Sequence, residues 1–483
     1  MAINIEQSSN VATEKTLIKA KHILFVWVGE VQKNSPFQAS LEAKLKRNKT
    51  KAGELAKKPV SVDLPNGGIA SWLLLQEQSA FQRQTLLRKA IKPLLDESPS
   101  ALHIVLIGEA SQLQKAARDA VYVTLVNAAE LPQQKKKDKS EALKQLFIHG
   151  VPAEADFADV AALAAGNSLT RQLTMLAPNL LTPTLYRKKI ADLAKTYGWK
   201  HEEFDMPKLK KMGAGAFVAV GQGSEPQDAA IVHLSYHPKG AKKHIALVGK
   251  GICFDTGGHN LKAARYMQGM HEDMNGSAVA LGILQTLTEQ KLPIKVDCWL
   301  AIAQNHIGPK AYKQNDIVTA LNGKTIEIVH TDAEGRMVLS DTLTLASREK
   351  PDLIIDYATL TGSMITAVGD RYSGIMGNRP EMLCKAVGAG MASGERVNAF
   401  PFDEDYDEDL ESDVADIKQC TLDSEADHVL AARFLSKFIE HDVSWLHVDL
   451  SAVKRKGGLG AVASDVTGFG VAFTTELIWR VMD

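Results

Sequence analysis

Strand-like and helix-like segments alternate between residues 230 and 357, and this alternation restricts the possible folds strongly. The strand-like segments are short and rich in Val, Ile and Leu, and the segments between them are long enough to form helices. The pattern predicts strands at residues 230–236, 244–254, 294–303, 325–329 and 352–357, and helices at residues 276–290 and 336–348. Such alternation is typical of a mostly parallel sheet with helices on both faces. In such a sheet the functional residues lie in loops at the carboxyl ends of strands.

The length of the chain favours two domains. At 483 residues with 45% apolar content, the chain exceeds what one average core accommodates. We expect an α/β fold in which each domain has a central mixed or mostly parallel sheet flanked by helices. The N-terminal α/β domain would span residues 1–160, a connecting helix residues 161–180, and a larger C-terminal domain residues 181–483.

Short apolar segments and a helix signal support these assignments. In the N-terminal domain, strands are predicted at residues 22–28, 103–107 and 120–126, with a helix at residues 109–117. Thr182 and Pro183 mark a helix start, because proline in the first turn needs no hydrogen-bond acceptor, and this helix should end near Gly198.

The charge and cysteine content exclude several classes of protein. A net charge of −1 gives no overall case for nucleic acid or an anionic membrane. The four cysteines have no C-x-x-C spacing, which argues against a disulfide framework and a thiolate zinc site. The N-terminus lacks a signal-peptide pattern, and no apolar run reaches the ~18 residues that a membrane helix needs. We therefore expect a cytoplasmic protein with no membrane partner.

The first 150 residues leave one alternative open. They hold 22 Lys and Arg against 14 Asp and Glu, so this part of the chain is net basic. Solvated domain surface explains such a bias most simply. The alternative is a non-catalytic or accessory nucleic-acid-binding protein on the same fold, whose affinity for duplex DNA would depend on salt.

Charged residues gather in the loops that follow the predicted strands. They are Lys250, Asp255, Lys262, Asp273, Asp332, Glu334 and Arg336. Hard oxygen ligands without thiolates favour Zn, Mn or Mg over copper or a cluster. Four carboxylates exceed the needs of one ion, whereas a bridging carboxylate between two ions about 3.5–4 Å apart would use them all.

The basic residues of this cluster can have separate roles. Burial and repulsion by a metal would lower the pKa of one lysine until its neutral amine coordinates, and the other lysine would remain charged to polarise substrate. Asp332 and Glu334 would project to one side if the backbone between them were extended. Arg336 opens a predicted helix, where free backbone N–H groups already favour a small anion.

Several of these segments resemble the M17 leucyl aminopeptidase, or cytosol aminopeptidase, family. The resemblance lies in residues 248–258, in Met270–Gly276 and above all in Thr331-Asp-Ala-Glu-Gly-Arg336, and it extends from Leu181 to Gly470. The N-terminal third matches only in outline. The resemblance implies a metalloaminopeptidase, in the form of a homohexamer, that releases N-terminal residues from peptides.

The same resemblance implies a role for each charged residue. Two Zn or Mn ions would be bridged by Asp255 and Glu334, with Asp332 completing one site and Lys250 and Asp273 the other. Lys262 would bind the substrate carbonyl, and Arg336 would hold a bicarbonate that acts as general base for the water bridging the two metals.

Other positions correspond to the substrate pocket of the family. Met270, Thr359 and Gly362 would line an apolar wall that favours Leu-like or Met-like side chains, and His330 would be a further wall residue. The chain departs from the family pattern at His259, at His330 and in the segment from Gln419 to His428. These departures should change the shape of the pocket more than the chemistry.

Overall fold

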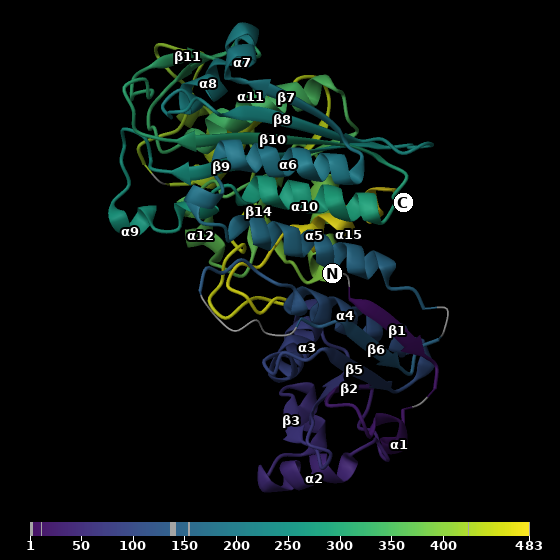
Figure 1. The fold of residues 1–483 in the computed structure, drawn as a ribbon. Helices are drawn as coiled ribbons and strands as arrows, with labels where there is room; N and C mark the ends of the chain where they lie inside the picture. The colour runs from purple at the N-terminus through teal and green to yellow at the C-terminus, as the bar shows by residue number, and fades with distance from the viewer. Residues whose placement is uncertain (1–2, 11, 136–141, 153–154, 424, 483) are drawn as a thin grey trace. The chain divides into compact units, whose positions relative to one another are not determined.

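The computed structural model describes residues 3–10, 12–135, 142–152, 155–423 and 425–482. It divides into two compact units (Figure 1). Unit 1 comprises Met1–Ala165, Met391–Glu395 and Lys456–Thr467, and unit 2 comprises Gly166–Gly390, Arg396–Arg455 and Gly468–Asp483. Among the described residues, no helix combines the length and the apolar character needed to cross a bilayer.

Unit 1 is built on a six-stranded sheet in the order β1-β6-β5-β2-β4-β3. The strands are β1 (Asn4–Ser8), β2 (His22–Val28), β3 (Val60–Asp63), β4 (Ile69–Leu75), β5 (Ala101–Ile107) and β6 (Gln145–His149). Every pairing is parallel except that of β3 with β4. The helical elements are α1 (Glu14–Leu17), α2 (Gln38–Arg47), η1 (Ala52–Ala56), α3 (Ala80–Leu95) and α4 (Ala110–Ala128). Phe25 and Trp72 stack in the core with ring centroids 4.7 Å apart.

The strand predicted at residues 120–126 is wrong, because these residues form the second half of α4. All seven are buried, so no polar face interrupts the apolar run and its helical period cannot be seen in the sequence. Packing on every side outweighs the modest cost of β-branched residues in a helix. The predicted strands at residues 22–28 and 103–107 are confirmed as β2 and β5.

Unit 2 contains an eight-stranded mixed sheet in the order β15-β14-β17-β13-β9-β10-β8-β7. Its strands are β7 (Lys200–Asp205), β8 (Ala230–Tyr236), β9 (His244–Asp255), β10 (Lys295–Asn305), β13 (Leu353–Ala358), β14 (Ser373–Gly377), β15 (Val397–Ala399) and β17 (Ser444–Asp449). The central strands β10, β9, β13 and β17 are mutually parallel. A separate small sheet joins β11 (Ile317–Thr319), β12 (Thr325–Glu327) and β16 (Ile417–Lys418).

Helices cover both faces of this sheet, as the sequence pattern predicts. The α-helices from residue 158 onwards are α5 (Ala158–Thr174), α6 (Pro183–Tyr197), α7 (Met206–Met212), α8 (Gly215–Gly221), α9 (Ala264–Met267), α10 (Asn275–Glu289), α11 (Glu334–Arg348), α12 (Gly362–Val368), α13 (Pro380–Ser393), α14 (Asp427–Ser436) and α15 (Val471–Met482). The predicted α/β fold class is confirmed, and so are the strands and helices predicted between residues 230 and 357.

The alternation of side chains along β9 places the two main helices on opposite faces. A Cβ at Gly249 would meet Ser277 of α10 at 2.5 Å, so this face of the strand lies against α10. The neighbouring Val248 points the other way, into a buried cluster that includes Met337 and Val338 of α11. Because side chains alternate along a strand, Lys250 shares the face of Val248 and points towards the start of α11.

Candidate metal centre

Two adjacent parallel strands end at the candidate site. Strand β9 contributes Lys250 and its last residue, Asp255, and β10 ends at Asn305, which lies opposite Asp255 in the register. The register shifts between Ala303 and Asn305, which brings the Asn305 side chain onto the carboxylate of Asp255. The site therefore lies at the carboxyl ends of strands, as predicted for this sheet.

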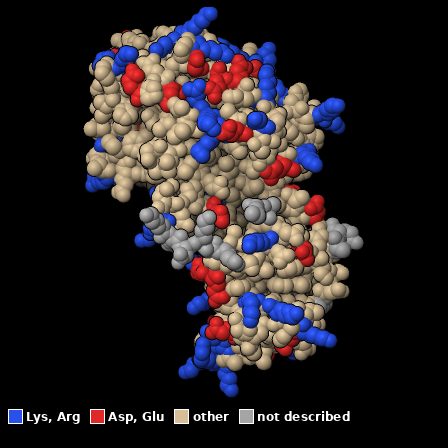
Figure 2. Space-filling view, in the orientation of Figure 1, with Lys and Arg blue, Asp and Glu red and all other residues tan. Residues whose placement is uncertain are grey.

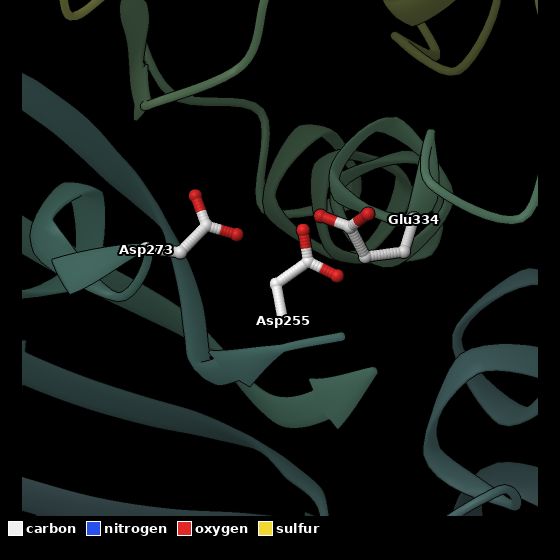
Figure 3. A group of neighbouring side chains, drawn as sticks. All are labelled: Asp255, Asp273 and Glu334. Atoms are coloured by element: carbon white, nitrogen blue, oxygen red, sulfur yellow. The ribbon is translucent and has the colours of Figure 1, made fainter. Parts of the chain in front are cut away.

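Three carboxylates meet at this edge. Asp273 follows the short helix η3 (Met270–Glu272), and Glu334 is the first residue of α11. Oxygens of Asp255, Asp273 and Glu334 all lie within 4.8 Å of one another (Figure 3). The three residues are 2%, 7% and 1% exposed. Carboxylates buried so closely require a positive charge among them.

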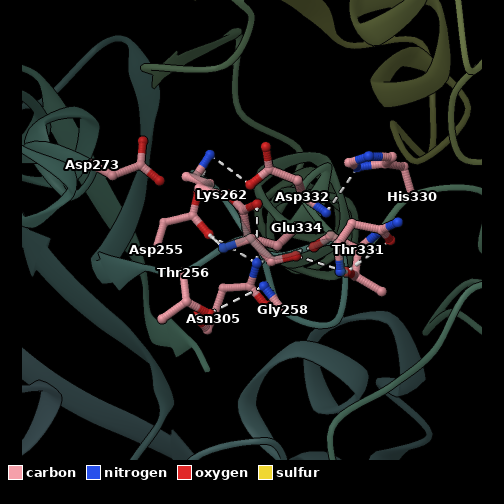
Figure 4. Close-up of polar contacts among 12 residues, drawn as sticks. Asp255, Thr256, Gly258, Lys262, Asp273, Asn305, His330, Thr331, Asp332 and Glu334 are labelled. Carbon is pink, nitrogen blue, oxygen red and sulfur yellow. Dashed lines mark hydrogen bonds and ion pairs between the residues drawn. The ribbon is translucent and has the colours of Figure 1, made fainter. Parts of the chain in front are cut away.

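Two lysines supply positive charge within the chain itself. The Nζ of Lys250 lies 2.8 Å from Asp273 Oδ2 and 2.9 Å from Glu334 Oε1. The Nζ of Lys262 lies 2.9 Å from Asp255 Oδ2 and 2.5 Å from Asp332 Oδ1 (Figure 4). The lysine side chains differ in exposure, at 4% for Lys250 and 15% for Lys262.

Asp332 reaches the cluster by a route that differs from the expected one. An extended backbone was expected between Asp332 and Glu334, but Thr331 and Asp332 form a turn and Glu334 already begins α11. Asp332 consequently lies beside Lys262 and outside the group of three carboxylates.

Burial raises the pKa of several acids in the cluster. The pKa of Asp273 rises to about 7, mainly through burial, although Lys250 opposes the rise. The pKa of Asp332 also rises to about 7, through burial and then the neighbouring Glu334 and Asp255. Burial and the charge of Asp255 raise the pKa of Glu334. The cluster therefore carries more negative charge than its own cations stabilise, and added positive charge would stabilise it.

The surrounding carboxylates raise the pKa of both lysines, which opposes the lowering that a nearby metal would cause. Burial lowers the pKa of Lys250, but the attraction of Asp273, Glu334 and Asp255 outweighs burial and the net shift is upward. The pKa of Lys262 is raised in the same way by Asp255, Glu334 and Asp332. A neutral amine at Lys250 therefore requires the positive charge of a bound metal beside it.

The donor set fits divalent metal ions. Asp273 Oδ2 and Asp332 Oδ1 are buried and accept no well-directed hydrogen bond from the described residues, although a lysine Nζ lies near each. Four carboxylates and an amine are hard ligands suited to Zn or Mn. Such ions would coordinate the two carboxylate oxygens to which the lysines donate no well-directed hydrogen bond.

Asn305 is a site residue that the sequence reasoning missed. Its Nδ2 donates to Asp255 Oδ1 at 2.9 Å and to the carbonyl of Thr331 at 3.0 Å, with Glu334 Oε2 at 3.4 Å. Asn305 therefore orients the carboxylate of Asp255 and holds the loop that carries Asp332 in place. In the sequence only its place just after a predicted strand points to it, because an asparagine at a strand end is common and its register with Asp255 follows from the fold.

Gln419 holds the loop before α11. Its Oε1 accepts hydrogen bonds from the backbone N–H groups of Val329 and His330, and its Nε2 donates to the carbonyl of Ala333. Gln419 is fully buried. Gln419, one of the residues that depart from the family pattern, therefore helps to hold the loop of the site in place.

Arg336 does not fit the bicarbonate that the resemblance implies. Its Nη2 donates to Asp427 Oδ1 at 2.7 Å and its Nη1 to the carbonyl of Gln419 at 3.1 Å. The Arg336 side chain is 3% exposed. A carboxylate of the chain therefore already neutralises this guanidinium, and we assign no step to bicarbonate.

Two of the four predicted pocket residues, Thr359 and His330, contact acidic residues of the cluster. Met270 begins η3 and is half-buried, and Gly362 begins α12 with open space where a Cβ would stand. Thr359 Oγ1 donates to Asp273 Oδ1 at 2.7 Å, and its carbonyl accepts from Lys250. His330 Nδ1 accepts from the N–H of Asp332 at 3.2 Å. Burial, Lys262 and Arg336 lower the pKa of His330, which Asp427 opposes.

Comparison with known proteins identifies related chains. Residues 168–475 match the model of the cytosol aminopeptidase family, catalytic domain. The chain is 41% identical over 351 residues to a probable cytosol aminopeptidase of Pseudomonas fluorescens (strain SBW25), covering 70% of each chain. It is 40% identical over 338 residues to a probable cytosol aminopeptidase of Stutzerimonas stutzeri (strain A1501), covering 67% of this chain and 68% of the relative. A solved structure of the bottromycin maturation enzyme BotP in complex with Mn is similar with a TM-score of 0.82 and 26% identity, over 96% of this chain and 100% of that chain.

The mixed sheet and the buried cluster of carboxylates and lysines define a metal-dependent hydrolase of the α/β class. The chain belongs to the M17 family of cytosol aminopeptidases, and it is a metalloaminopeptidase. The resemblance inferred from the sequence is thereby confirmed. The comparisons do not favour the alternative of a nucleic-acid-binding protein. On the face shown in Figure 2, acidic side chains are interspersed among the basic ones.

Proposed function

We propose that this enzyme releases apolar N-terminal residues of the Leu or Met type from peptides by means of two divalent metal ions. The ligands would be Lys250, Asp255, Asp273, Asp332 and Glu334, with Asp255 and Glu334 shared between the ions. When bound, such a pair of ions lowers the pKa of water and polarises a peptide carbonyl. The observation that carries the proposal is the buried group of three carboxylates, each adjacent to a lysine or to Asn305.

The two lysines have different tasks in this proposal. Lys250 is almost fully buried between Asp273 and Glu334, so it acts as a ligand and has no route to substrate. Lys262 is more exposed and its raised pKa keeps it charged, so it binds the carbonyl oxygen of the scissile peptide bond. The oxyanion that develops on this oxygen strengthens the contact in the transition state.

The substrate side chain would lie against Met270, Thr359 and Gly362, with His330 at the edge of the pocket. Open space at Gly362 and the half-buried thioether of Met270 suit an apolar side chain. The hydroxyl of Thr359 donates to Asp273, so the methyl group of Thr359 would face the substrate side chain. The apolar preference rests on this lining.

The metals are Zn or Mn, and the protein acts in the cytoplasm as a homohexamer. A structural relative is described in complex with Mn, which supports Mn as an occupant. Relatives are named cytosol aminopeptidases, which supports the cytoplasm. The hexamer rests on the family resemblance. Bicarbonate has no place in the mechanism proposed for this chain, because Arg336 is paired with Asp427.

The proposal is tested with protein that is stripped of metal and reloaded with Zn or Mn. Hydrolysis of a panel of aminoacyl chromogenic amides should require metal and should be fastest for Leu or Met. Asp332→Ala should reduce the rate by roughly 100-fold or more, because an absent ligand costs metal and orientation together. Asp192→Ala, at an exposed carboxylate on α6, is the matched control and should retain full activity.

Two results would contradict the proposal. Full activity of Asp332→Ala would remove Asp332 from the metal site. Tight binding of metal without turnover of any amide would mean that the substrate class is different.

A further inference from the structure

We infer that Asp427 is the anion that Arg336 holds in this chain, so that an internal carboxylate takes the place of a bound bicarbonate. The inference rests on the proposed function, because it concerns what completes the same active site. It explains why the segment from Gln419 to His428 departs from the family pattern. The consequence is an enzyme whose activity does not depend on bicarbonate.

The ion pair itself is the first observation. Arg336 lies in the first turn of α11, two residues after Glu334, and its side chain is 3% exposed. Asp427 Oδ1 stands 2.7 Å from its Nη2, and the Asp427 side chain is 24% exposed. A charge-assisted hydrogen bond to so deeply buried a guanidinium is strong, and its loss would leave a buried charge unpaired.

Both ends of the segment are fixed, which keeps Asp427 in place. At one end, Gln419 bonds to the loop before α11 with its side chain and to Arg336 with its carbonyl. At the other end, the N–H of His428 donates to Ser363 Oγ at 2.9 Å. The ring of His428 also packs edge-to-face with that of Phe400, and their centroids are 4.7 Å apart. Asp427 is therefore held on Arg336 by contacts on either side of it.

The conformation of the helix start favours the same role. Asp427 is the first residue of α14, and the preceding residue, Ala426, adopts a left-handed conformation at φ 50°. The N-cap residue, Ala426, makes no side-chain cap, and Ser363 Oγ already accepts from the N–H of His428 in the first turn, so the Asp427 carboxylate is not needed as a cap. It is directed at Arg336 instead.

A second anion on Arg336 would be opposed by the surrounding charge. Asp427 already neutralises the guanidinium, and Glu334 and Asp332 precede Arg336 by two and four positions on the same helix and the loop before it. The Nε–H of Arg336 donates to no partner among the described residues, so it is a donor that could still hold an external anion. The experiment must therefore measure the binding of bicarbonate directly.

The test uses the metal-loaded full-length protein and ¹³C-labelled bicarbonate in buffer otherwise free of carbon dioxide. We expect wild-type protein to cause no saturable broadening of the bicarbonate ¹³C resonance, and its turnover to be unchanged by added bicarbonate. Asp427→Ala should gain saturable binding, and its turnover should rise by roughly 100-fold when bicarbonate is added, the lower range for a positioned acid–base group.

Asp427→Glu is the matched control. The longer side chain keeps a carboxylate charge for Arg336, so neither bicarbonate binding nor stimulation should appear. Thermal melting and metal content of each variant confirm that the fold and the ions are retained.

Saturable bicarbonate binding by the wild type, abolished in Arg336→Ala, would overturn the inference and leave the proposed function intact. A folded Asp427→Ala that gains no bicarbonate binding would also overturn it. If no amide is hydrolysed by any form, the proposed function fails, while the ¹³C measurement still decides whether Asp427 excludes bicarbonate.

Discussion

Asn305 connects the metal-binding carboxylates to the loop that carries Asp332. One amide group donates to Asp255 and to the carbonyl of Thr331, and a second group, the hydroxyl of Tyr312, donates to the same carbonyl at 2.7 Å. The turn at Thr331 is thereby fixed from the end of β10 and from the loop that follows this strand. Groups that orient metal ligands typically control affinity as much as the ligands do.

Replacing Asn305 should therefore weaken the metal site without unfolding the chain. Asn305→Ala removes the hydrogen bonds to Asp255 and Thr331, and we expect metal affinity or turnover to fall by roughly 10–100-fold. Metal titration of stripped protein, with kcat measured at saturating metal, checks this. Asn378→Ala is the control, because the half-buried Asn378 likewise bonds through its amide, but only to backbone groups of Val443 and Trp445. An unchanged titration for Asn305→Ala would make Asn305 a packing residue only.

The residue types of the site were predictable only in part. Acids and lysines after strand-like segments are conspicuous, so Asp255, Asp273 and Glu334 could be identified from the sequence. A single asparagine is common at strand ends and carries no such signal. The pairing of Arg336 with Asp427 spans 91 positions and follows from tertiary packing, which local patterns do not encode.

At the scale of elements, α10 and the sheet determine where Asp273 lies. The helix begins two residues after Asp273, and a Cβ at Gly276 in its first turn would stand 2.1 Å from the carbonyl oxygen of Tyr357 on β13. Only glycine permits this approach, because the neighbouring atoms belong to backbone and cannot rotate away. The close contact presses the start of the helix against the strand ends that form the site.

Gly276→Ala should consequently lower both stability and metal affinity. Alanine would favour the helix by about 1 kcal/mol, but the backbone clash should cost about 1–3 kcal/mol or more and displace Asp273. Urea unfolding and metal titration of the variant measure the two effects. Gly53→Ala is the control, since a Cβ there has nothing within 4 Å. A Gly276→Ala protein with wild-type stability would show that the helix can shift freely.

Elements with one polar face were predictable and elements buried on all sides were not. The helix at residues 183–197 has a proline at its start, Gly198 in a left-handed conformation at its end and an exposed face, and its predicted limits are confirmed. The second half of α4 has no exposed face, so the run resembled a buried strand. The error reflects the absence of periodicity in a fully buried segment.

At the scale of the whole molecule, unit 1 carries a titratable pair of its own. His103 on β5 and His149 on β6 approach to 3.0 Å between Nδ1 and Nε2, and His103 stacks on Phe147. Burial, and then the nearness of His149, lowers the pKa of His103 to about 4 from 6.5. Burial also lowers the pKa of His149. Two neutral rings therefore suit the folded sheet.

Unit 1 should lose stability on mild acidification. Between pH 6.5 and about 4 the unfolded chain binds more protons than the folded one, so the unfolding free energy falls as the pH falls through this window. His149→Gln should reduce the loss of unfolding free energy between pH 7 and pH 5 by roughly 1 kcal/mol, after allowance for solvent screening. Urea unfolding at both pH values, followed by hydrogen exchange of peptides from β5 and β6, measures it. His22→Gln is the control, and equal losses in wild type and His149→Gln would refute the role of the pair.

Unit 1 is discontinuous in the chain, and this has a consequence for biosynthesis. Asn127 on α4 donates to the carbonyl of Ala461 and accepts from the N–H of Ala463, and Arg88 on α3 donates to the carbonyl of Val462. A ribosome makes these partners more than 300 positions later. Unit 1 is thus the first unit to leave the ribosome and among the last to be completed. The hydrogen bonds from α3 and α4 to residues 461–463 can form only after nearly the whole polypeptide has been synthesised.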